Sequence, residues 1–348
     1  MSHHFFFSKE QLSHPLDAVV VENALVDLLV RANDEQLKSF GMSKGVMQLV
    51  EKETQSMVLQ RLNEMNHIVP EVELGGSASN AARGMAVLGS RTSYSSCLSQ
   101  DKYGEMFISR LKEVGIKDRT CFAKENTSTG TCVVVVTPDK ERTLNTHLGA
   151  CRYYTKNDLP FEDIIQSKLF FSTGYMLDTQ NQIDALHAAL DFANLNNVKV
   201  AFDVADPFVI QRHGPQVILH LLEKTHLVFA NAKEAEMLLG CSGEEAALKL
   251  GQLVQIAVVK DGDKGAFVAH DEKVTHISPK NVQVTDTTGA GDMFAAGFMA
   301  GLCRGLDLES CGKIATILAS DTITHLGVRL TSGIEHEIEE LLSYGCKA

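Results

Sequence analysis

The sequence predicts an α/β protein built around a mostly parallel sheet. From about residue 166 onward, helical patterns such as 180–196 alternate with short apolar runs at 168–174, 198–204, 225–231 and 255–262. Continuous apolar strands alternating with helices are typical of a parallel sheet that is covered on both faces. In such sheets ligands bind beyond the carboxyl ends of the strands. The residues at those ends are polar: Asp203, Asp206, Asn231, Lys260 and Asp261.

The first half of the chain shows the same elements in a less regular order. Residues 18–30 form an apolar run that predicts a strand pair or a bent strand. Residues 79–90 predict a helix of small residues, and 92–99 predict a strand. An amphipathic pattern at 104–115 predicts a helix that ends at Gly115.

One segment departs from the parallel pattern. Residues 129–150 predict two strands around a turn at 138–140. In the second strand Thr143, Asn145 and His147 alternate with less polar residues, so we expect one polar face turned toward water or a ligand. We expect this hairpin, with parts of 22–74, to form a small antiparallel β lid beside the main sheet, and 1–348 to be a single domain.

Composition excludes several classes of protein. The 348 residues carry a net charge of −12 and no run of Lys and Arg, which argues against a nucleic-acid partner. No apolar run approaches a membrane span and no signal peptide is predicted. The eight cysteines form no C-x-x-C pair, and "HEIEE" has Glu340 where a zinc motif needs histidine. We therefore expect a cytoplasmic protein with reduced thiols and a small-molecule partner.

The stretch "DTTGAGDMFAAGF" (286–298) carries the strongest chemical signal. Glycines at 289 and 291 let the backbone approach a ligand, and N–H groups at a helix start bind anions. Asp292 beside such an anion site suits phosphoryl transfer, in which the amides stabilise the moving group and the carboxylate orients an attacking alcohol. An ordinary glycine helix entry with a dipole-stabilising aspartate explains the motif as well.

Other phosphate and dinucleotide motifs are absent. A G-x-G-x-x-G fingerprint fails because Phe294 stands where the third glycine belongs. A Walker A loop fails because Ile314 follows Lys313 where Ser or Thr is needed.

"DTTGAGD" resembles the C-terminal signature of the ribokinase-like (PfkB) carbohydrate and nucleoside kinases, and "GGSASNAARGMAVLG" (75–89) resembles the other family signature. The resemblance runs from about Asp17 to Arg329. The strings "NALVDLLV", "TPDKERTLNTHLGA" and "ADPF" look most like the adenosine-kinase-like branch. The resemblance implies a ribokinase-like three-layer sandwich with a small β lid.

It also implies roles for the acceptor side of the site. Asp292 would be the catalytic base, and the backbone of Gly289, Ala290 and Gly291 the anion hole. The substrate hydroxyls would be held by Asp27, Asn80 and the Gly75–Gly76 backbone, although Asn80 also suits a helix cap. From the hairpin, Arg142 and Asn145 are candidate substrate-binding residues that equally suit a solvated strand.

On the nucleotide side, Asn231 and Glu234 would organise Mg²⁺ and the ATP phosphates, largely through water. Lys260, Gly262 and Gly265 would form the turn over the nucleotide. The stretch His325–Gly327–Arg329 is a candidate monovalent-cation or adenine site, as in some relatives. Two residues depart from the family pattern: Glu22 stands where glycine is usual, and Lys260 where a smaller hydroxyl residue is common.

The predicted function is an ATP- and Mg²⁺-dependent kinase that phosphorylates a primary hydroxyl of a nucleoside or sugar. Adenosine is the first candidate acceptor, and a free sugar such as ribose or fructose is the alternative within the class. A non-catalytic nucleotide or sugar sensor with the same fold is the alternative outside it. A nicotinamide oxidoreductase is disfavoured by the missing fingerprint. The sequence leaves open whether the protein is a monomer or a homodimer.

Overall fold

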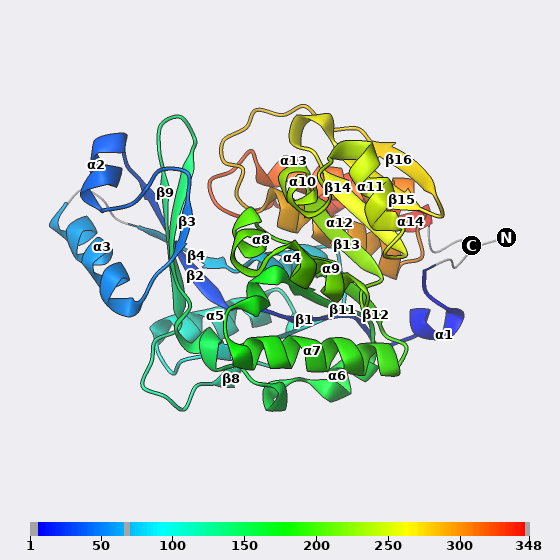
Figure 1. The fold of residues 1–348 in the computed structure, drawn as a ribbon, viewed down its shortest axis with the longest axis horizontal. Coiled ribbons are helices and arrows are strands. Elements are labelled where there is room, and N and C mark those ends of the chain that lie inside the picture. Colours follow the sequence, from blue (N-terminus) through cyan, green and yellow to red (C-terminus); the bar gives the residue numbers. More distant parts are fainter. Residues whose placement is uncertain (1–5, 66–69, 345–348) are drawn as a thin grey trace.

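The computed structural model describes residues 6–65 and 70–344. Figure 1 shows a large sheet with helices on both faces and, at the far end from the termini, a smaller sheet that carries α2 and α3. Residues 66–69, which fall inside the 22–74 stretch assigned to the lid, lie outside the described residues.

The large sheet has the strand order β16-β15-β14-β13-β12-β11-β1-β5-β7. Its strands are parallel from β14 to β7, and β15 and β16 add an antiparallel edge. This arrangement confirms the predicted mostly parallel sheet. The strands are β1 (Leu16–Val21), β5 (Thr92–Ser95), β7 (Lys117–Asp118), β11 (Ser167–Thr173), β12 (Lys199–Asp203), β13 (Leu227–Asn231), β14 (Ile256–Lys260), β15 (Ala266–His270) and β16 (Lys273–Ile277).

Two buried clusters lie on opposite faces of this sheet, because alternate strand residues such as Val19 and Val20 point to opposite sides. One face packs against α4 (Ser77–Val87), α5 (Lys102–Glu113), α12 (Ala290–Cys303), α13 (Leu308–Thr322) and α14 (Ile334–Tyr344). The other packs against α6 (Phe161–Ile165), α7 (Gln180–Leu195), α8 (Pro207–His213), α9 (Pro215–Leu222), α10 (Ala232–Leu239) and α11 (Gly243–Gly251). The result is the expected three-layer arrangement.

The small sheet, which we call the lid, has the order β3-β10-β9-β2-β4. The pairs β9/β10 and β2/β4 are antiparallel, and β2 joins them by pairing with β9 in parallel. The lid strands and helices are β2 (Leu25–Arg31), α2 (Asp34–Ser39), β3 (Met47–Leu49), α3 (Lys52–Glu64), β4 (Glu71–Gly75), β9 (Gly130–Val136) and β10 (Arg142–His147). Outside both sheets lie α1 (Lys9–Leu12) and the short pair β6 (Cys97–Leu98) and β8 (Cys121–Phe122).

The polar face of β10 points away from both water and the cavity. Thr143, Asn145 and His147 are all buried. Gln55 of α3 donates from Nε2 to the backbone oxygens of Asn145 and Thr131, each at 3.0 Å. The expected orientation therefore does not hold, because alternation predicts two faces but not which of them a covering helix buries.

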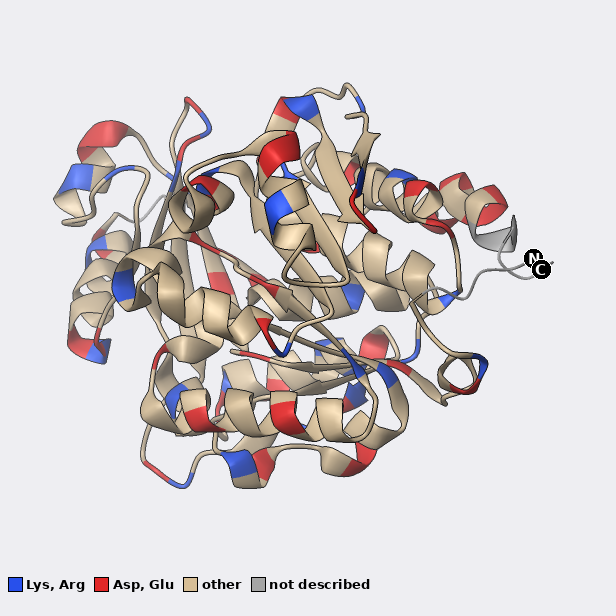
Figure 2. Ribbon diagram, turned by 45° about the vertical axis from the view of Figure 1, so that its right-hand side comes forward, with Lys and Arg blue, Asp and Glu red and all other residues tan. Residues whose placement is uncertain are grey.

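Charges of both signs are interspersed over the helices (Figure 2). Within the described ranges, no helix combines the length and the apolar character that crossing a membrane requires.

Candidate active site

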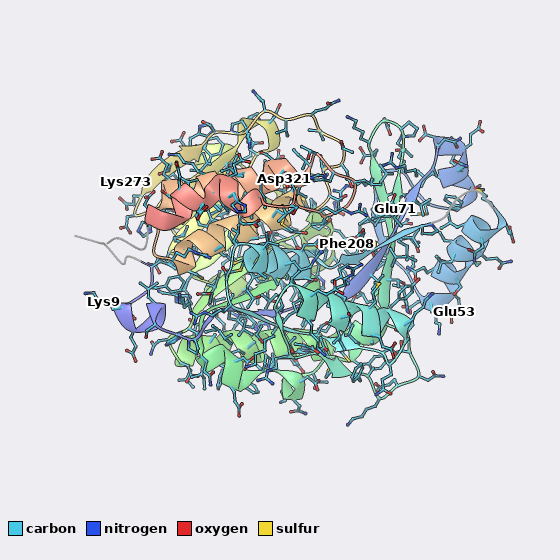
Figure 3. All side chains as sticks on the ribbon, turned by 180° about the vertical axis from the view of Figure 1, so that it is seen from behind. Lys9, Glu53, Glu71, Phe208, Lys273 and Asp321 are labelled. Carbon is cyan, nitrogen blue, oxygen red and sulfur yellow. The ribbon has the colours of Figure 1, made fainter. Side chains whose placement is uncertain are left out.

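A cavity of about 730 Å³ lies between the carboxyl edge of the large sheet and the inner face of the lid. Figure 3, seen from behind, labels Phe208 of its wall near the middle of the molecule, between Asp321 of the main body and Glu71 of the lid. The predicted site residues that line the cavity are Asp27, Gly76, Asn80, Arg142, Asn231, Glu234, Lys260, Gly262, Gly265, Gly289, Ala290, Gly291 and Asp292. Gly75 and Asn145 are not part of its lining.

The start of α12 opens onto this cavity. Gly289 has a φ of +71°, and a Cβ there would meet Val328 Cγ2 at 2.5 Å, so the entry turn needs glycine. The Ala290 N–H makes a long bond of 3.4 Å to the Thr287 carbonyl. No protein acceptor meets the Gly291 or Asp292 N–H within residues 6–65 and 70–344. These amides are free to bind an anion, as the orphan N–H groups of a helix start do.

Two residues of α4 hold the Asp292 carboxylate. Ser77 donates from Oγ to Oδ1 at 2.7 Å, and Asn80 donates from Nδ2 to Oδ2 at 2.8 Å. Burial raises the pKa of Asp292 above its ordinary value, and these two hydrogen bonds act against the rise. Gly76, not Asn80, occupies the N-cap of α4. Asn80 therefore orients the carboxylate instead of capping its own helix.

Asp27 lies on the lid side of the cavity, on β2. Burial raises its pKa to about 7, while Arg83 lowers it. A Cβ on Gly75 would come within 2.1 Å of Asp27 Oδ1, so the glycine makes room for the carboxylate. Gly76 has a φ of +86°, which a side chain there would strain. The glycine pair thus shapes the space in which Asp27 meets a ligand.

The two candidates from the hairpin, Arg142 and Asn145, lie on opposite faces of β10. Arg142 points from β10 toward the loop that precedes α12, where its Nη1 donates to Thr288 Oγ1 at 3.0 Å and its Nε lies 3.9 Å from Asp286 Oδ1. Asn145 is 2% exposed on the opposite face of the strand, beneath α3. The structure therefore brings Arg142 to the site and leaves Asn145 outside it.

Asn231 and Glu234 form a capping box at the start of α10. The Asn231 N–H donates to Glu234 Oε2 at 2.8 Å, and the Glu234 N–H donates to Asn231 Oδ1 at 2.9 Å. Burial raises the pKa of Glu234 to about 8, and the Asp203 carboxylate raises it further, while Lys260 lowers it. A carboxylate whose charge is disfavoured by neighbouring carboxylates suits a divalent cation, so these oxygen donors fit Mg²⁺ held through water.

Lys260 reaches into the cavity from the end of β14. Its Nζ lies 2.8 Å from Asp203 Oδ2, and the side chain is 16% exposed. Gly262 and Gly265 follow in the turn toward β15, with φ values of +54° and +86°. A Cβ on Gly265 would come within 2.0 Å of the Ile277 carbonyl, so the turn requires glycine there.

Comparison with known proteins decides the family. The model of the pfkB family of carbohydrate kinases matches residues 37–334. This chain belongs to the pfkB family. It is therefore a kinase that transfers a phosphoryl group from ATP to a hydroxyl group.

Individual members are similar over most of their length. The adenosine kinase of Saccharomyces cerevisiae is 28% identical over 329 residues, covering 89% of this chain and 95% of the yeast protein. The crystal structure of adenosine kinase from Sinorhizobium meliloti superposes with a TM-score of 0.87 at 29% identity, covering 93% and 99% of the two chains. A probable sugar kinase from Rhizobium etli gives the same TM-score and identity over 94% and 98%.

The stretch 325–329 of this pfkB kinase does not reach the cavity. The Gly327 N–H donates to Asp286 Oδ2 at 2.9 Å, and Arg329 pairs with Glu71 and Glu73 of the lid. The Asp286 carboxylate also accepts from the N–H and Oγ1 of Thr288. None of the residues 325–329 lines the cavity, so the structure does not bring this stretch to the other predicted site residues.

Two residues at the kinase site, Ser77 and Arg83, escaped sequence reasoning. Ser77 lies in "GGSASN", but nothing in that string indicates which partner it meets. Arg83 donates to Asn80 Oδ1 and to the Leu74 carbonyl from beneath the site. The sequence marks Asp203 only as a polar strand-end residue, with no role assigned, and it ends β12 at the carboxyl edge of the sheet.

Proposed function

We propose that this kinase phosphorylates the primary hydroxyl of a nucleoside, with adenosine as the first candidate. The supporting observation is the contrast between the two walls of the cavity. Polar groups gather around Asp292 on the main body and at Asp27 on the lid, whereas the rest of the inner face of the lid is largely apolar. Its apolar residues are Leu25, Met47, Leu49, Cys132, Leu144 and Leu148.

A nucleoside has hydroxyls for the polar groups of the cavity and a flat base for its apolar wall, whereas a free sugar has only hydroxyls. The ribose hydroxyls would meet Asp27 and the Gly76 turn, and a flat base would bury against the lid residues. A free sugar carries hydroxyls on all sides, and burying one of them against apolar carbons leaves it without a hydrogen-bond partner. The names of the yeast and Sinorhizobium relatives make adenosine the first nucleoside to test.

In the proposed reaction Asp292 orients the acceptor hydroxyl and takes its proton as the new O–P bond forms. Ser77 and Asn80 fix both carboxylate oxygens, and the raised pKa of Asp292 makes it a better base than an ordinary aspartate. The amides of 289–291 would stabilise charge on the phosphoryl group in transfer. Because the proton leaves late in a loose transition state, orientation matters more than basicity.

The nucleotide would lie on the other side of the same loop. Asn231 and Glu234 would hold Mg²⁺ through water, where the ion neutralises phosphate charge. The turn with Gly262 and Gly265 would cover the nucleotide, and Lys260 would contact its phosphates.

An acceptor panel tests this function. Purified protein with ATP and Mg²⁺ is offered adenosine, inosine, guanosine, uridine, ribose and fructose, and ADP formation is followed. We expect a kcat/KM for one nucleoside at least about a hundredfold above that for ribose, since unpaired buried hydroxyls cost about 1–3 kcal/mol each. Higher efficiency with a free sugar contradicts the nucleoside proposal. Ligand-induced stabilisation without ADP formation favours a sensor.

Asp292→Asn tests the base. We expect kcat to fall by about 10²–10⁴-fold, while the melting temperature and ADP affinity change little. Asp321→Asn removes a carboxylate of α13 that bonds Thr331 outside the cavity lining, and it serves as the matched control. Retention of full activity by Asp292→Asn excludes this residue as the base.

A further inference from the structure

Three adjacent parallel strands end side by side in the cavity. Asp203 ends β12, Asn231 ends β13 and Lys260 ends β14. Asn231 is in register with Lys260, and Asp203 with Phe229 of the strand between them. The Lys260 side chain reaches across the end of β13 to Asp203, and its Nζ lies 5.8 Å from the centroid of the Phe229 ring. The sheet itself therefore fixes where this ammonium sits.

The ammonium also lies against the start of α12. A Cβ placed on Gly291 would come within 3.1 Å of Lys260 Nζ, so the absence of a side chain at 291 admits the lysine. Gly291 contributes one of the N–H groups that open onto the cavity. An anionic group bound on these amides would lie next to the ammonium as well, and charge-assisted donors are the strong ones.

Stability of the fold does not readily explain why Lys260 and Asp203 form a buried pair. Buried ion pairs typically add little net stability, because desolvation offsets the attraction between the charges. Asp203 is nevertheless held in place, since its Oδ1 accepts the Ala205 N–H at 3.0 Å in a turn where Ala205 has a φ of +80°. Within the described ranges Asp203 is the one hydrogen-bond acceptor of Lys260, so two of the three N–H groups remain for a ligand.

Asp203 gives this buried ammonium a carboxylate partner at 2.8 Å. A fixed positive charge beside the anion hole is preorganised for negative charge that develops there, which is how such groups accelerate a reaction.

We propose that Lys260 is a catalytic residue whose ammonium binds the phosphoryl group during transfer, and that Asp203 is a positioning residue that holds it over Gly291. The inference rests on the proposed phosphoryl-transfer site at 289–292. It assigns Lys260 a role in the transition state, in addition to binding the phosphates of the nucleotide before transfer. The acceptor O–P bond forms, the bond to ADP breaks, and the acceptor proton goes to Asp292. Lys260 exchanges no proton and forms no covalent bond.

The test compares Lys260→Met, Lys260→Arg and Asp203→Asn with wild type, using the best acceptor of the panel. We expect Lys260→Met to lower kcat by about 10²–10³-fold, as loss of one transition-state donor does, with ADP affinity nearly unchanged. Lys260→Arg keeps the charge and recovers a large part of kcat. Asp203→Asn keeps an acceptor for the Ala205 N–H and lowers kcat less. The double variant is no worse than Lys260→Met, because the two residues act as one unit.

Lys168→Met is the matched control. Lys168 pairs with Asp17 at 2.7 Å and is 7% exposed, but it lies near the amino end of β11, away from the cavity. We expect it to lower the urea midpoint of unfolding while kcat per folded molecule is unchanged. Folded molecules are counted by ADP titration.

Three results overturn the inference for Lys260. They are a Lys260→Met kcat within about threefold of wild type, a defect confined to KM for ATP and to ADP affinity, and an equal kcat loss in Lys168→Met. Failure of the proposed function looks different. Higher efficiency with a free sugar contradicts the nucleoside proposal and leaves the Lys260 test to be run with that sugar, whereas wild-type protein that turns over no acceptor overturns both.

Discussion

At the scale of single residues, the structure gives Glu22 a clear structural role. It ends the run that begins with β1 and is 2% exposed at the cavity floor. Its Oε2 accepts the Ala78 N–H at 2.9 Å in the first turn of α4, whose N-cap Gly76 has no side chain. Glu22 therefore caps α4 from the loop between β1 and β2, as a local Ser or Asp commonly does.

The protonation of Glu22 predicts that the stability of the folded protein depends on pH. Burial raises its pKa to about 8; the Ala78 N–H lowers it and the nearby Asp292 carboxylate raises it. Between an unfolded pKa near 4.5 and a folded pKa near 8, the native state binds the extra proton. Its stability therefore falls as pH rises through this window and no further above it. Other titratable groups that face Glu22 are Tyr94, Cys151 and Tyr175.

Glu22→Gln keeps the acceptor for Ala78 and cannot ionise. We expect its melting temperature to approach that of wild type near pH 5 and to exceed it by several degrees near pH 8.5, because each unit of pKa shift is worth about 1.4 kcal/mol. Scanning calorimetry from pH 5 to 9 measures the difference. Glu53→Gln, an exposed change on α3, should track wild type throughout. A difference between Glu22→Gln and wild type that does not vary with pH contradicts the buried-proton account.

At the scale of elements, a few polar contacts join the lid to the main body near the start of α12. Arg142 of β10 bonds Thr288, Lys140 of the hairpin turn donates to the Val284 carbonyl at 2.6 Å, and Arg329 reaches Glu71 of β4. Arg142, Val284 and Thr288 also line the cavity, so two of these contacts join the lid to the main body beside it. We therefore expect the position of the lid and the geometry of residues 286–288 to be coupled through Arg142.

Arg142→Ala removes the contact closest to the anion hole. We expect KM for the acceptor to rise by about tenfold and amide exchange in 130–147 to quicken, because the lid loses an anchor while the two sheets keep their cores. Arg61→Ala is the control, since Arg61 bonds the Ser39 carbonyl within the lid and touches no part of the catalytic loop. Equal exchange in both variants refutes the coupling.

Element boundaries were predictable to within a few residues where the pattern was local. The helix expected over 180–196 spans Gln180–Leu195, and the strand expected over 168–174 spans Ser167–Thr173. The helix expected over 79–90 begins earlier, at Ser77, because Glu22 caps it from another element. Which face of β10 is turned to the cavity was not predictable, since α3 covers the face with Asn145 from outside the hairpin.

At the scale of the whole molecule, the cavity is shared between the lid and the main sheet. Asp27 and the apolar wall come from the lid, whereas Asp292, Lys260 and Glu234 come from the main body. A ligand that contacts both walls binds the folded, closed arrangement and not the unfolded chain, so it stabilises the protein by mass action.

Adenosine should therefore raise the melting temperature. At about one hundred times its Kd the expected gain is about 2.7 kcal/mol, seen as a shift of several degrees in differential scanning fluorimetry. Ribose at the same concentration should give a smaller shift because it cannot reach the apolar wall of the lid. Asp27→Asn should retain the fold and lose most of the adenosine shift. An undiminished shift in Asp27→Asn shows that Asp27 does not hold the ligand.

The sequence by itself determined the parallel sheet, the glycine-bearing start of the late helix and the polar ends of the strands. The strands follow from the local pattern of apolar residues. The start of the helix follows from glycine, which tolerates backbone conformations that strain other residues. Only the tertiary structure decided which side chains meet. Ser77 bonds Asp292 across 215 residues, Lys260 meets Asp203 across 57, and Asn145 turns away beneath α3. Such pairs follow from how layers pack, and packing depends on residues that are distant in the chain.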